Sequence, residues 1–392
     1  MNHNRPSYDA LIVGGGVIGL SIAMRAAEAG VHACVIERGV PAGGTTSVAA
    51  GMLAPVGEAS WGEDSLLELG RTSLQMWPRF ASDVEALAGT SAGFRATGAL
   101  HVALDRDEAE ELGRRHELQR RLGLESERLR PSGCRELEPG LSTAVTAGVY
   151  VPGDSAADPE QLSEALVGAL RAVGAELITG AEVVGADPSD GGWELRLADE
   201  RRLAGEQLVV ATGAWAGGGA WLPDEMRPPV RPVKGEILTL RGPADAPACE
   251  HIVAGDRIYL VPRDDGRLIA GATVEERGFD SAIAAGGVLE LLREAYRVLP
   301  QIAELEFVEA RVGLRPGTPD NAPVIGPDAS GRAILATGHF RNGILLAPVT
   351  ADAVAALLAG KSPPVELAPF SPMRFDRDRP RTAVGGAEVG AR

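Results

Sequence analysis

The sequence has few cysteines and no long apolar run, and each absence excludes a class of protein. Its three cysteines, Cys34, Cys134 and Cys249, show neither CxxC spacing nor a metal-ligand pattern. A sparse, odd number of thiols is typical of a reducing compartment, so we expect a cytoplasmic protein. The first apolar run, residues 10–13, is too short for a signal-peptide core, and no run approaches the length of a membrane span.

Positive charge is also scarce, because 38 Lys and Arg stand against 54 Asp and Glu, a formal net charge of -16. This excess argues against nucleic acid or an anionic membrane as a partner. An acidic protein that binds an acidic small molecule must therefore concentrate arginine or lysine locally. No catalytic triad, metal cluster or close acid pair is found, so no residue is assigned as a general acid or base and no metal is expected.

A glycine-rich motif begins directly after a short apolar segment near the N-terminus. Residues 10–13 are predicted to form a buried strand, residues 20–29 a helix and residues 33–36 a second strand. The motif Gly14-Gly15-Gly16-Val17-Ile18-Gly19 lies between the first strand and the helix, and Glu37 ends the second strand. This order of elements is typical of a dinucleotide-binding fold.

Each part of the motif has a physical task. Gly14 allows a tight turn, Gly16 lets the backbone approach a pyrophosphate, and Gly19 lets the helix pack closely against the strand. The helix N-terminus offers N–H donors to phosphate. Glu37 can accept the ribose hydroxyls, which disfavours NADP but leaves FAD and NAD open. A ligand-free glycine turn is the alternative.

Small and hydroxyl-bearing residues fill the segment 45–55, which reads Thr-Thr-Ser-Val-Ala-Ala-Gly-Met-Leu-Ala-Pro. Small side chains allow a large flat group to approach the backbone, and hydroxyls can donate to phosphate or ring oxygens. Taken alone, the segment is better explained as a Ser/Thr cap of the next helix.

The middle of the chain alternates helices and short strands. Residues 64–89 are expected to be helical with an interruption at Pro78, and residues 107–123 form a solvated amphipathic helix. Asp158 is expected to cap a helix that begins at Pro159 and ends at Gly174. A later strand, residues 208–211, leads into Thr212-Gly213-Ala214-Trp215.

Several consecutive strands between residues 230 and 312 predict an antiparallel sheet in a second domain. Arg257, Tyr259 and Val261 are expected on one face of their strand. Residues 313–326 are dense in Gly and Pro and are predicted to form a fixed loop. Arg315 precedes a proline in that loop, which suits bidentate recognition of a carboxylate, although a structural ion pair is the commoner fate of such an arginine.

A strand at residues 333–336 is followed by Thr-Gly-His-Phe-Arg-Asn-Gly-Ile-Leu-Leu-Ala-Pro at 337–348 and then by an apolar helix up to Ala359. The strand–glycine–helix order repeats the anion-binding arrangement of the N-terminus. His339 is a plausible neighbour of a flat ligand, but a structural role is the usual one for a single histidine.

The N-terminal motif, the 45–55 segment and the 337–348 segment together resemble the D-amino-acid-oxidase superfamily of FAD-dependent oxidoreductases, and more narrowly the glycine oxidases of thiazole (thiamine) biosynthesis. The resemblance runs from about Tyr8 to Gly360. It implies non-covalent FAD, a small amino acid substrate and oxygen, with hydride transfer to flavin and release of the oxo acid, ammonia and hydrogen peroxide. Cofactor contacts are expected at Gly14, Gly16, Val17, Ile18, Gly19, Glu37, Arg38, Thr45, Thr46, Ser47, Ala50, Gly51, Met52, Val183, Thr212, Gly213, Trp215, His339, Arg341, Asn342, Gly343 and Ile344.

The resemblance also implies the substrate contacts. Arg315 matches the arginine that holds the substrate carboxylate and Tyr259 the tyrosine that assists it, with Arg341, Met52 and Arg257 nearby. A D-amino-acid or sarcosine oxidase and a quinone-linked dehydrogenase are the alternatives within the class. A non-catalytic, NAD-binding regulatory protein is the alternative outside it.

The expected fold class is α/β with two domains, a Rossmann-like FAD-binding domain and a mainly antiparallel substrate domain. The FAD-binding domain is predicted to be discontinuous, with residues 1–90, 150–225 and 320–365. The substrate domain would take residues 91–149 and 226–319. Residues 376–392 are expected to form a mobile tail, and no pattern indicates whether the chain forms a homo-oligomer.

Overall fold

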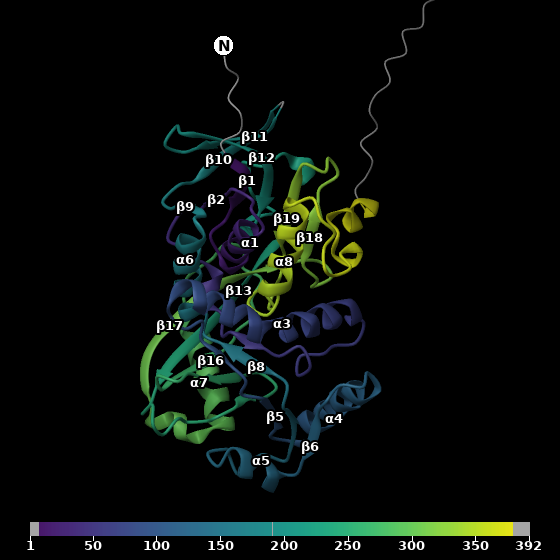
Figure 1. The fold of residues 1–392 in the computed structure, drawn as a ribbon. Helices are drawn as coiled ribbons and strands as arrows, with labels where there is room; N and C mark the ends of the chain where they lie inside the picture. The colour runs from purple at the N-terminus through teal and green to yellow at the C-terminus, as the bar shows by residue number, and fades with distance from the viewer. Residues whose placement is uncertain (1–7, 190, 379–392) are drawn as a thin grey trace, which may run out of the picture.

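Two eight-stranded sheets lie one above the other in the computed structural model, which describes residues 8–189 and 191–378 (Figure 1). The first sheet occupies the upper half of the view and the second the lower half, with helix α3 between them. The sheets take their strands from alternating stretches of sequence, so the chain passes between the two halves several times.

The first sheet has a parallel centre. It contains, in spatial order, β10 (Val183–Ser189), β11 (Gly192–Leu197), β12 (Arg202–Val210), β1 (Tyr8–Val13), β2 (Ala33–Ile36) and β9 (Glu176–Ile178), with β19 (Ala333–Thr337) beside β12 and β18 (Val324–Pro327) beside β19. β1 pairs in parallel with β2 and β12, and β12 pairs in parallel with β19. Continuous apolar runs such as Ala10–Val13 form these strands because both faces of a parallel sheet are covered.

Four helices cover one face of this sheet. They are α1 (Val17–Glu28), α3 (Asp64–Ala88), α6 (Pro159–Val173) and α8 (Ala347–Leu358). Apolar residues of all four helices share one buried cluster with the sheet. The cap predicted for α6 is confirmed, because the Asp158 carboxylate accepts the backbone N–H of Glu160 and Gly174 ends the helix at φ 73°.

The central strands of the first sheet end at a common edge. Gly14 follows β1, Glu37 follows β2, Thr212 comes two residues after β12, and Gly338 follows β19. Ligands of open parallel sheets bind at such an edge, where the strands' carboxyl ends meet. Predicted sequence motifs that lie more than 300 residues apart therefore meet here.

The second sheet is mostly antiparallel, as predicted. It contains, in spatial order, β17 (Glu306–Gly317), β13 (Arg231–Arg241), β16 (Arg267–Gly271), β15 (Tyr259–Pro262), β14 (Ile252–Ala254), β5 (Ala99–Ala103), β7 (Ala147–Val151) and β6 (Glu127–Leu129). Helices α5 (Pro131–Leu137) and α7 (Ala285–Val298) pack with one face. The opposite face carries Ile237, Val261 and Ile269, which cluster with Ala50 and Ala156.

Smaller elements complete the chain. A three-stranded sheet holds β3 (Met52–Leu53), β8 (Ser155–Ala157) and β4 (Phe94–Arg95), and α4 (Arg106–Arg121) packs against β5 and β7. The short helices are α2 (Thr45–Val48), η1 (Gly213–Trp215), η2 (Asp224–Met226), η3 (Pro300–Glu304), η4 (Ala368–Phe370) and η5 (Pro372–Asp378). Within the described residues, no helix combines the length and apolarity that crossing a membrane requires.

Two predictions of local structure were wrong. α3 continues through Pro78 as one helix, because Trp77 and Phe80 on both sides of the proline are buried in the core. The loop predicted from residue 313 begins only after Gly317, because β17 stays paired with β13 up to that residue. Pro316 is tolerated there since β17 is an edge strand. The mobile tail expected at residues 376–392 stays a prediction, because η5 ends at Asp378 and residues 379–392 lie outside the described part of the chain.

Candidate active site

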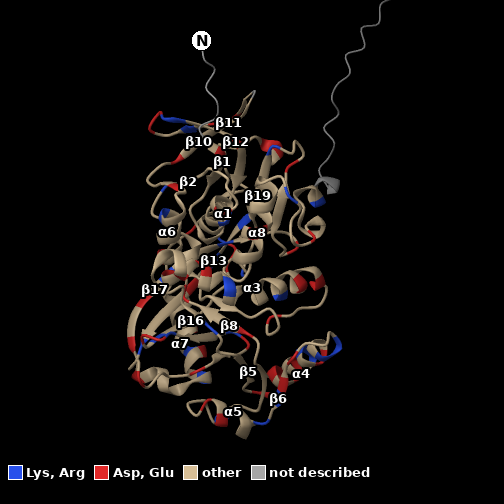
Figure 2. Ribbon diagram, viewed as in Figure 1, with Lys and Arg blue, Asp and Glu red and all other residues tan. Residues whose placement is uncertain are grey.

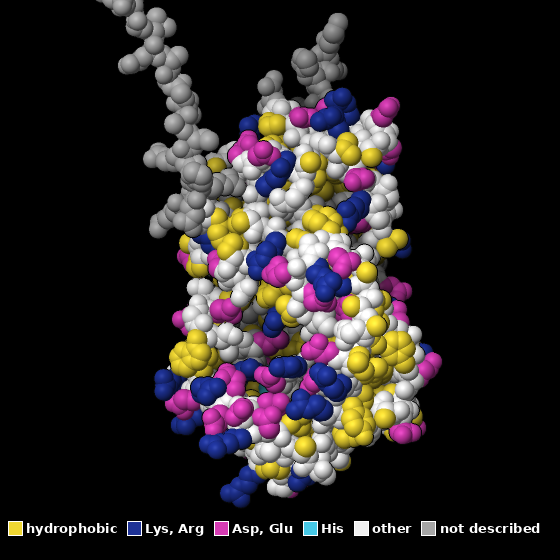
Figure 3. Space-filling view, turned by 180° about the vertical axis from the view of Figure 1, so that it is seen from behind, with side chains coloured by type: hydrophobic (Ala, Val, Ile, Leu, Met, Phe, Trp, Pro, Cys, Tyr) yellow, Lys and Arg dark blue, Asp and Glu magenta, His cyan; other side chains and the backbone are white. Residues whose placement is uncertain are grey.

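A cavity of about 1690 Å³ opens between the carboxyl edge of the first sheet and the second sheet. Residues from β1, β2 and β19 and from the turn after β12 line one part of it, and residues from β13, β15, β16 and β17 line another. The volume exceeds the roughly 300–1,000 Å³ of pockets for drug-sized ligands. Seen from behind, the molecule is hollowed between its two halves, and basic and acidic side chains crowd below the hollow (Figure 3).

The glycine motif has the geometry that its spacing predicts. Gly14 adopts φ 110°, and a Cβ there would lie 2.5 Å from the Ala211 carbonyl oxygen. A Cβ on Gly19 would lie 1.9 Å from the Gly14 carbonyl oxygen, so this glycine sets the close packing of α1 on the turn. The backbone at Gly14 and Gly16 is consequently open to the cavity at the N-terminus of α1.

Glu37 lies where a carboxylate can meet a ribose. Its Oε2 accepts the Gly15 N–H at 2.8 Å and its Oε1 accepts the Gly39 N–H at 2.8 Å. Two backbone bonds fix the carboxylate at the cavity wall, and each oxygen retains a further lone pair for a hydroxyl donor.

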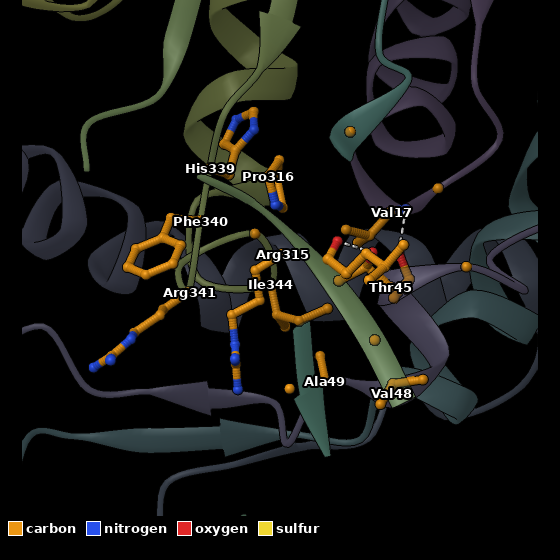
Figure 4. Close-up of a pocket in the computed structure, with 18 of the residues that line it drawn as sticks. Val17, Thr45, Val48, Ala49, Arg315, Pro316, His339, Phe340, Arg341 and Ile344 are labelled. Atoms are coloured by element: carbon orange, nitrogen blue, oxygen red, sulfur yellow. Dashed lines mark hydrogen bonds between the residues drawn. The ribbon is translucent and has the colours of Figure 1, made fainter. Parts of the chain in front are cut away.

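The hydroxyls of segment 45–55 do not cap the next helix, contrary to the simplest prediction. The residue before α2 is Gly44, which offers no side chain. Thr46 Oγ1 instead accepts the Val17 N–H at 3.2 Å, so it serves the N-terminus of α1, and Thr45 Oγ1 donates to the Leu314 carbonyl at 2.6 Å. These bonds, drawn in part in Figure 4, tie the segment to both halves of the molecule.

Arg315 extends from β17 into the other part of the cavity. Its Nη1 donates to the Thr273 carbonyl at 3.1 Å, and the guanidinium lies close enough to Tyr259 to lower the pKa of its phenol. A Cβ on Gly235 would lie 2.2 Å from Arg315 Nη1, so the guanidinium lies across a strand position that has no side chain. Arg315 and Arg341 point toward the same side of the cavity (Figure 4).

Tyr259 and Glu58 complete this group of polar side chains. Burial raises the pKa of Tyr259 above its ordinary value, against the lowering effect of Arg315. Glu58 lines the cavity and is exposed to solvent there. The surrounding protein raises the pKa of its carboxyl, while Arg341, Arg115 and Arg315 act in the opposite direction. We call Glu58, Arg115, Tyr259, Arg315 and Arg341 the substrate end of the cavity.

This geometry agrees with the comparisons with known proteins. The family model described as FAD dependent oxidoreductase matches residues 9–357. The chain belongs to this family. It is therefore an oxidoreductase that uses FAD, and its fold is the two-domain α/β fold of these enzymes.

Similar proteins cover nearly the whole chain. A glycine oxidase of Geobacillus kaustophilus is 35% identical over 93% of this chain and 96% of its own length. The crystal structure of that enzyme superposes with a TM-score of 0.87, covering 94% of this chain and 98% of the other. The bifunctional protein ThiO/ThiG of Trichormus variabilis is 34% identical over 96% of this chain, which spans only 56% of that longer protein.

The residues at the carboxyl edge fit FAD. Thr212 Oγ1 is buried at the cavity without a hydrogen-bond partner in the described part of the chain, as expected of a group that a ligand satisfies. Glycine and small residues leave backbone uncovered at Gly14, Gly16 and Gly213. Arg38 stacks on Trp215 at 4.2 Å from the ring centroid, forming a further wall. We call this part, with Glu37, the dinucleotide end of the cavity.

Most residues expected to contact cofactor or substrate line the cavity, and three do not. Gly19 packs beneath the motif, Ser47 donates to the Gly44 carbonyl, and Asn342 faces a smaller neighbouring pocket. Arg257 is exposed at the rim of the cavity, with its Nε 3.8 Å from Asp256 Oδ2. It was predicted to belong to a strand, but β15 begins only at Tyr259. His339 is buried and its Nε2 contacts Thr350 Oγ1 at 3.1 Å, which gives it a structural partner.

Sequence reasoning missed Glu58, His101 and Arg115, which also line the cavity. Arg115 belongs to the helix that was interpreted as solvated, and its sequence gives no sign of a cavity-facing position. Glu58 follows the recognised 45–55 segment closely and could have been found by extending that segment. His101 occupies a strand of the second sheet, where an alternating pattern alone is uninformative.

Proposed function

We propose that this chain oxidises glycine, and other small amines that carry a neighbouring carboxylate, to the oxo acid with release of ammonia and hydrogen peroxide. The observation that carries the proposal is the position of Arg315, Tyr259 and Arg341 in the cavity whose far part holds the dinucleotide motif. A carboxylate binder therefore shares one cavity with the redox cofactor site. The similar glycine oxidases support glycine as the substrate.

In this proposal Arg315 binds the substrate carboxylate. Its guanidinium is held by the Thr273 carbonyl and lies beside Tyr259, and its planar fork suits bidentate contact with a carboxylate. Tyr259 keeps its phenolic proton because its pKa is raised, so it can donate a hydrogen bond to the bound carboxylate. FAD, when bound, supplies the acceptor for a hydride from the carbon that bears the amine.

No general base is assigned to the reaction. His339 is held neutral because burial lowers its pKa to about 3, and it is already bonded to Thr350. Glu58 is the carboxylate at the substrate end, and we propose that it faces the amine of the substrate. The product imine hydrolyses to the oxo acid and ammonia, and the two electrons pass to oxygen, which becomes hydrogen peroxide.

The two sheets support separate roles for the two halves of the molecule. We propose that residues 1–90, 150–225 and 320–365 form the FAD-binding unit and residues 91–149 and 226–319 the substrate unit. The supporting observation is that β5, β6, β7 and β13 to β17 belong to the second sheet. We further propose a cytoplasmic location, oxygen as electron acceptor, and a role in thiazole biosynthesis, which the ThiO/ThiG relatives support.

The visible spectrum of the purified protein tests the proposal. A yellow protein that bleaches when glycine is added without oxygen, and that forms peroxide when oxygen returns, is the expected result. Bleaching with sarcosine or D-alanine but not glycine would move the substrate to one of those amines. Bleaching without peroxide would favour a quinone-linked dehydrogenase. A flavoprotein unaffected by all three compounds would contradict the proposal.

A further inference from the structure

Helix α4 carries five arginines, and one of them differs from the rest. Four form ion pairs with glutamates of the same helix, namely Arg106 with Glu110, Arg114 with Glu111, and Arg120 and Arg121 with Glu117. Figure 2 shows the mixed charges along this helix. Arg115 is instead half-buried and lines the cavity, and no hydrogen bond or ion pair engages it within the described part of the chain.

The residues around Arg115 do not cancel its charge. His101 lines the cavity near it and is neutral, because burial and the charge of Arg115 lower the pKa of His101 to about 4. Glu58 is the acidic neighbour, and it interacts with Arg315 and Arg341 as well. Glu58 therefore faces three guanidinium groups at the substrate end, and Glu63, which lines the smaller neighbouring pocket, is a second carboxylate near it.

The position of Arg115 predicts a ligand with a second negative group beside the carboxylate on Arg315. Arg115, Arg315 and Arg341 exceed Glu58 and Glu63 by one positive charge when all are ionised. A glycine-like substrate has one carboxylate, which Arg315 would bind, and Arg115 would then still make no hydrogen bond or ion pair within the described part of the chain. An unpaired cation at a protein cavity is stabilised by an anionic ligand group.

We propose that Arg115 binds a second anionic group of the substrate, so that the enzyme favours amino acids with two acidic groups over their uncharged amides. This inference rests on the proposed function, because it places the first carboxylate on Arg315. The second group could be attached to the amine nitrogen or to the α-carbon. With either attachment, a carboxylate of the substrate would pair with the Arg115 guanidinium.

Two matched pairs of compounds test the proposal and separate these sources. N-(carboxymethyl)glycine and its monoamide differ in charge on the nitrogen substituent, whereas D-aspartate and D-asparagine differ on the side chain. For each pair the measured quantity is kcat/KM of the acid divided by kcat/KM of the amide. We expect a ratio of about tenfold or more for at least one pair, since a charged hydrogen bond contributes a factor of that size.

Variants of α4 identify the residue responsible. In Arg115→Gln the ratio should fall to within about threefold of unity, whereas Arg115→Lys should keep most of it. Arg114→Gln is the matched control, because Arg114 is exposed and pairs with Glu111 outside the cavity. Its ratio should equal that of the wild type. If Arg115→Gln loses its flavin, the comparison between Arg115→Lys and wild type at rising salt replaces it, and a ratio insensitive to salt would count against the proposal.

Two results would overturn the inference. One is an enzyme that oxidises glycine but uses each acid no better than its amide. The other is a high ratio that Arg115→Gln leaves unchanged. If none of the compounds is oxidised, the proposed function fails, but the inference about Arg115 can still be tested. The dissociation constants of the same four compounds are then measured from changes in the flavin spectrum, and the constant of each amide is divided by that of its acid.

Discussion

The two ends of the cavity are built from different parts of the polypeptide. At the dinucleotide end the groups that face the ligand are mainly backbone, uncovered by Gly14, Gly16 and Gly213. At the substrate end they are polar and charged side chains, among them those of Arg115 on α4, Tyr259 on β15 and Arg315 on β17. A backbone site is set by local conformation, whereas a side-chain site is set by tertiary packing, so the two ends should respond differently to mutation.

The largest effect is expected from Gly14→Ala. The new Cβ would meet the Ala211 carbonyl oxygen at 2.5 Å on a residue with φ 110°, so the turn must move. We expect loss of bound FAD, measured as the flavin absorbance that stays with the protein through gel filtration.

Gly30→Ala is the control for that variant. Gly30 also has a positive φ, 85°, but a Cβ there would have no neighbour within 4 Å. It should lower the free energy of unfolding by about 1–2 kcal/mol through backbone strain while the protein stays yellow. A Gly14→Ala protein that is as yellow as Gly30→Ala would show that the backbone at the motif does not set FAD binding.

Arg315→Ala should have a smaller effect, and it should weaken substrate binding rather than FAD binding. Losing a charged hydrogen bond of about 1.5–3 kcal/mol should raise KM for glycine by about ten- to hundredfold while FAD stays bound. Arg315→Lys should recover part of the loss, because lysine keeps the charge but not the planar fork. Unchanged glycine kinetics in Arg315→Ala would contradict the assigned carboxylate site.

The buried histidine near the dinucleotide end gives a prediction about pH. The folded-state pKa of His339 is lowered to about 3, while the unfolded chain takes up the proton near the ordinary 6.5. Stability from the neutral ring is therefore present above pH 6.5 and is lost as the pH falls toward 3. At pH 5 the free energy of unfolding is about 2 kcal/mol lower than at pH 7, because pH 5 lies about 1.5 units below the unfolded-state pKa.

His339→Gln isolates that contribution, since glutamine cannot be protonated but can still bond Thr350. Denaturant midpoints at pH 7 and pH 5 should drop less in the variant than in the wild type. His101, whose pKa is lowered in the same direction, is present in both proteins and cancels from the comparison. Equal drops would show that His339 is not buried as a neutral ring.

The difference between local conformation and tertiary packing also explains which features could be predicted from the sequence. The order strand, glycines, helix, strand and acid is local, so β1, α1, β2 and the position of Glu37 were predictable. The extension of β17 to Gly317 depends on pairing with β13, which is more than 70 residues away, and glycine and proline content suggested a loop instead. Arg115 reaches the cavity through the packing of α4, and helical periodicity cannot distinguish it from its solvated neighbour Arg114.

The smallest effect is expected from Tyr259→Phe, which removes one hydroxyl from the substrate end and keeps the ring. The lost hydrogen bond to the substrate carboxylate is worth about 0.5–1.5 kcal/mol, so kcat/KM for glycine should fall by about two- to tenfold. Because burial raises the phenol pKa above its ordinary 10.0, the ratio of the two proteins' kcat/KM should stay constant from neutral pH up to about 9. A ratio that changes across that range would mean that Tyr259 ionises within it, and the tyrosine would then be a titrating group of the site rather than a fixed donor.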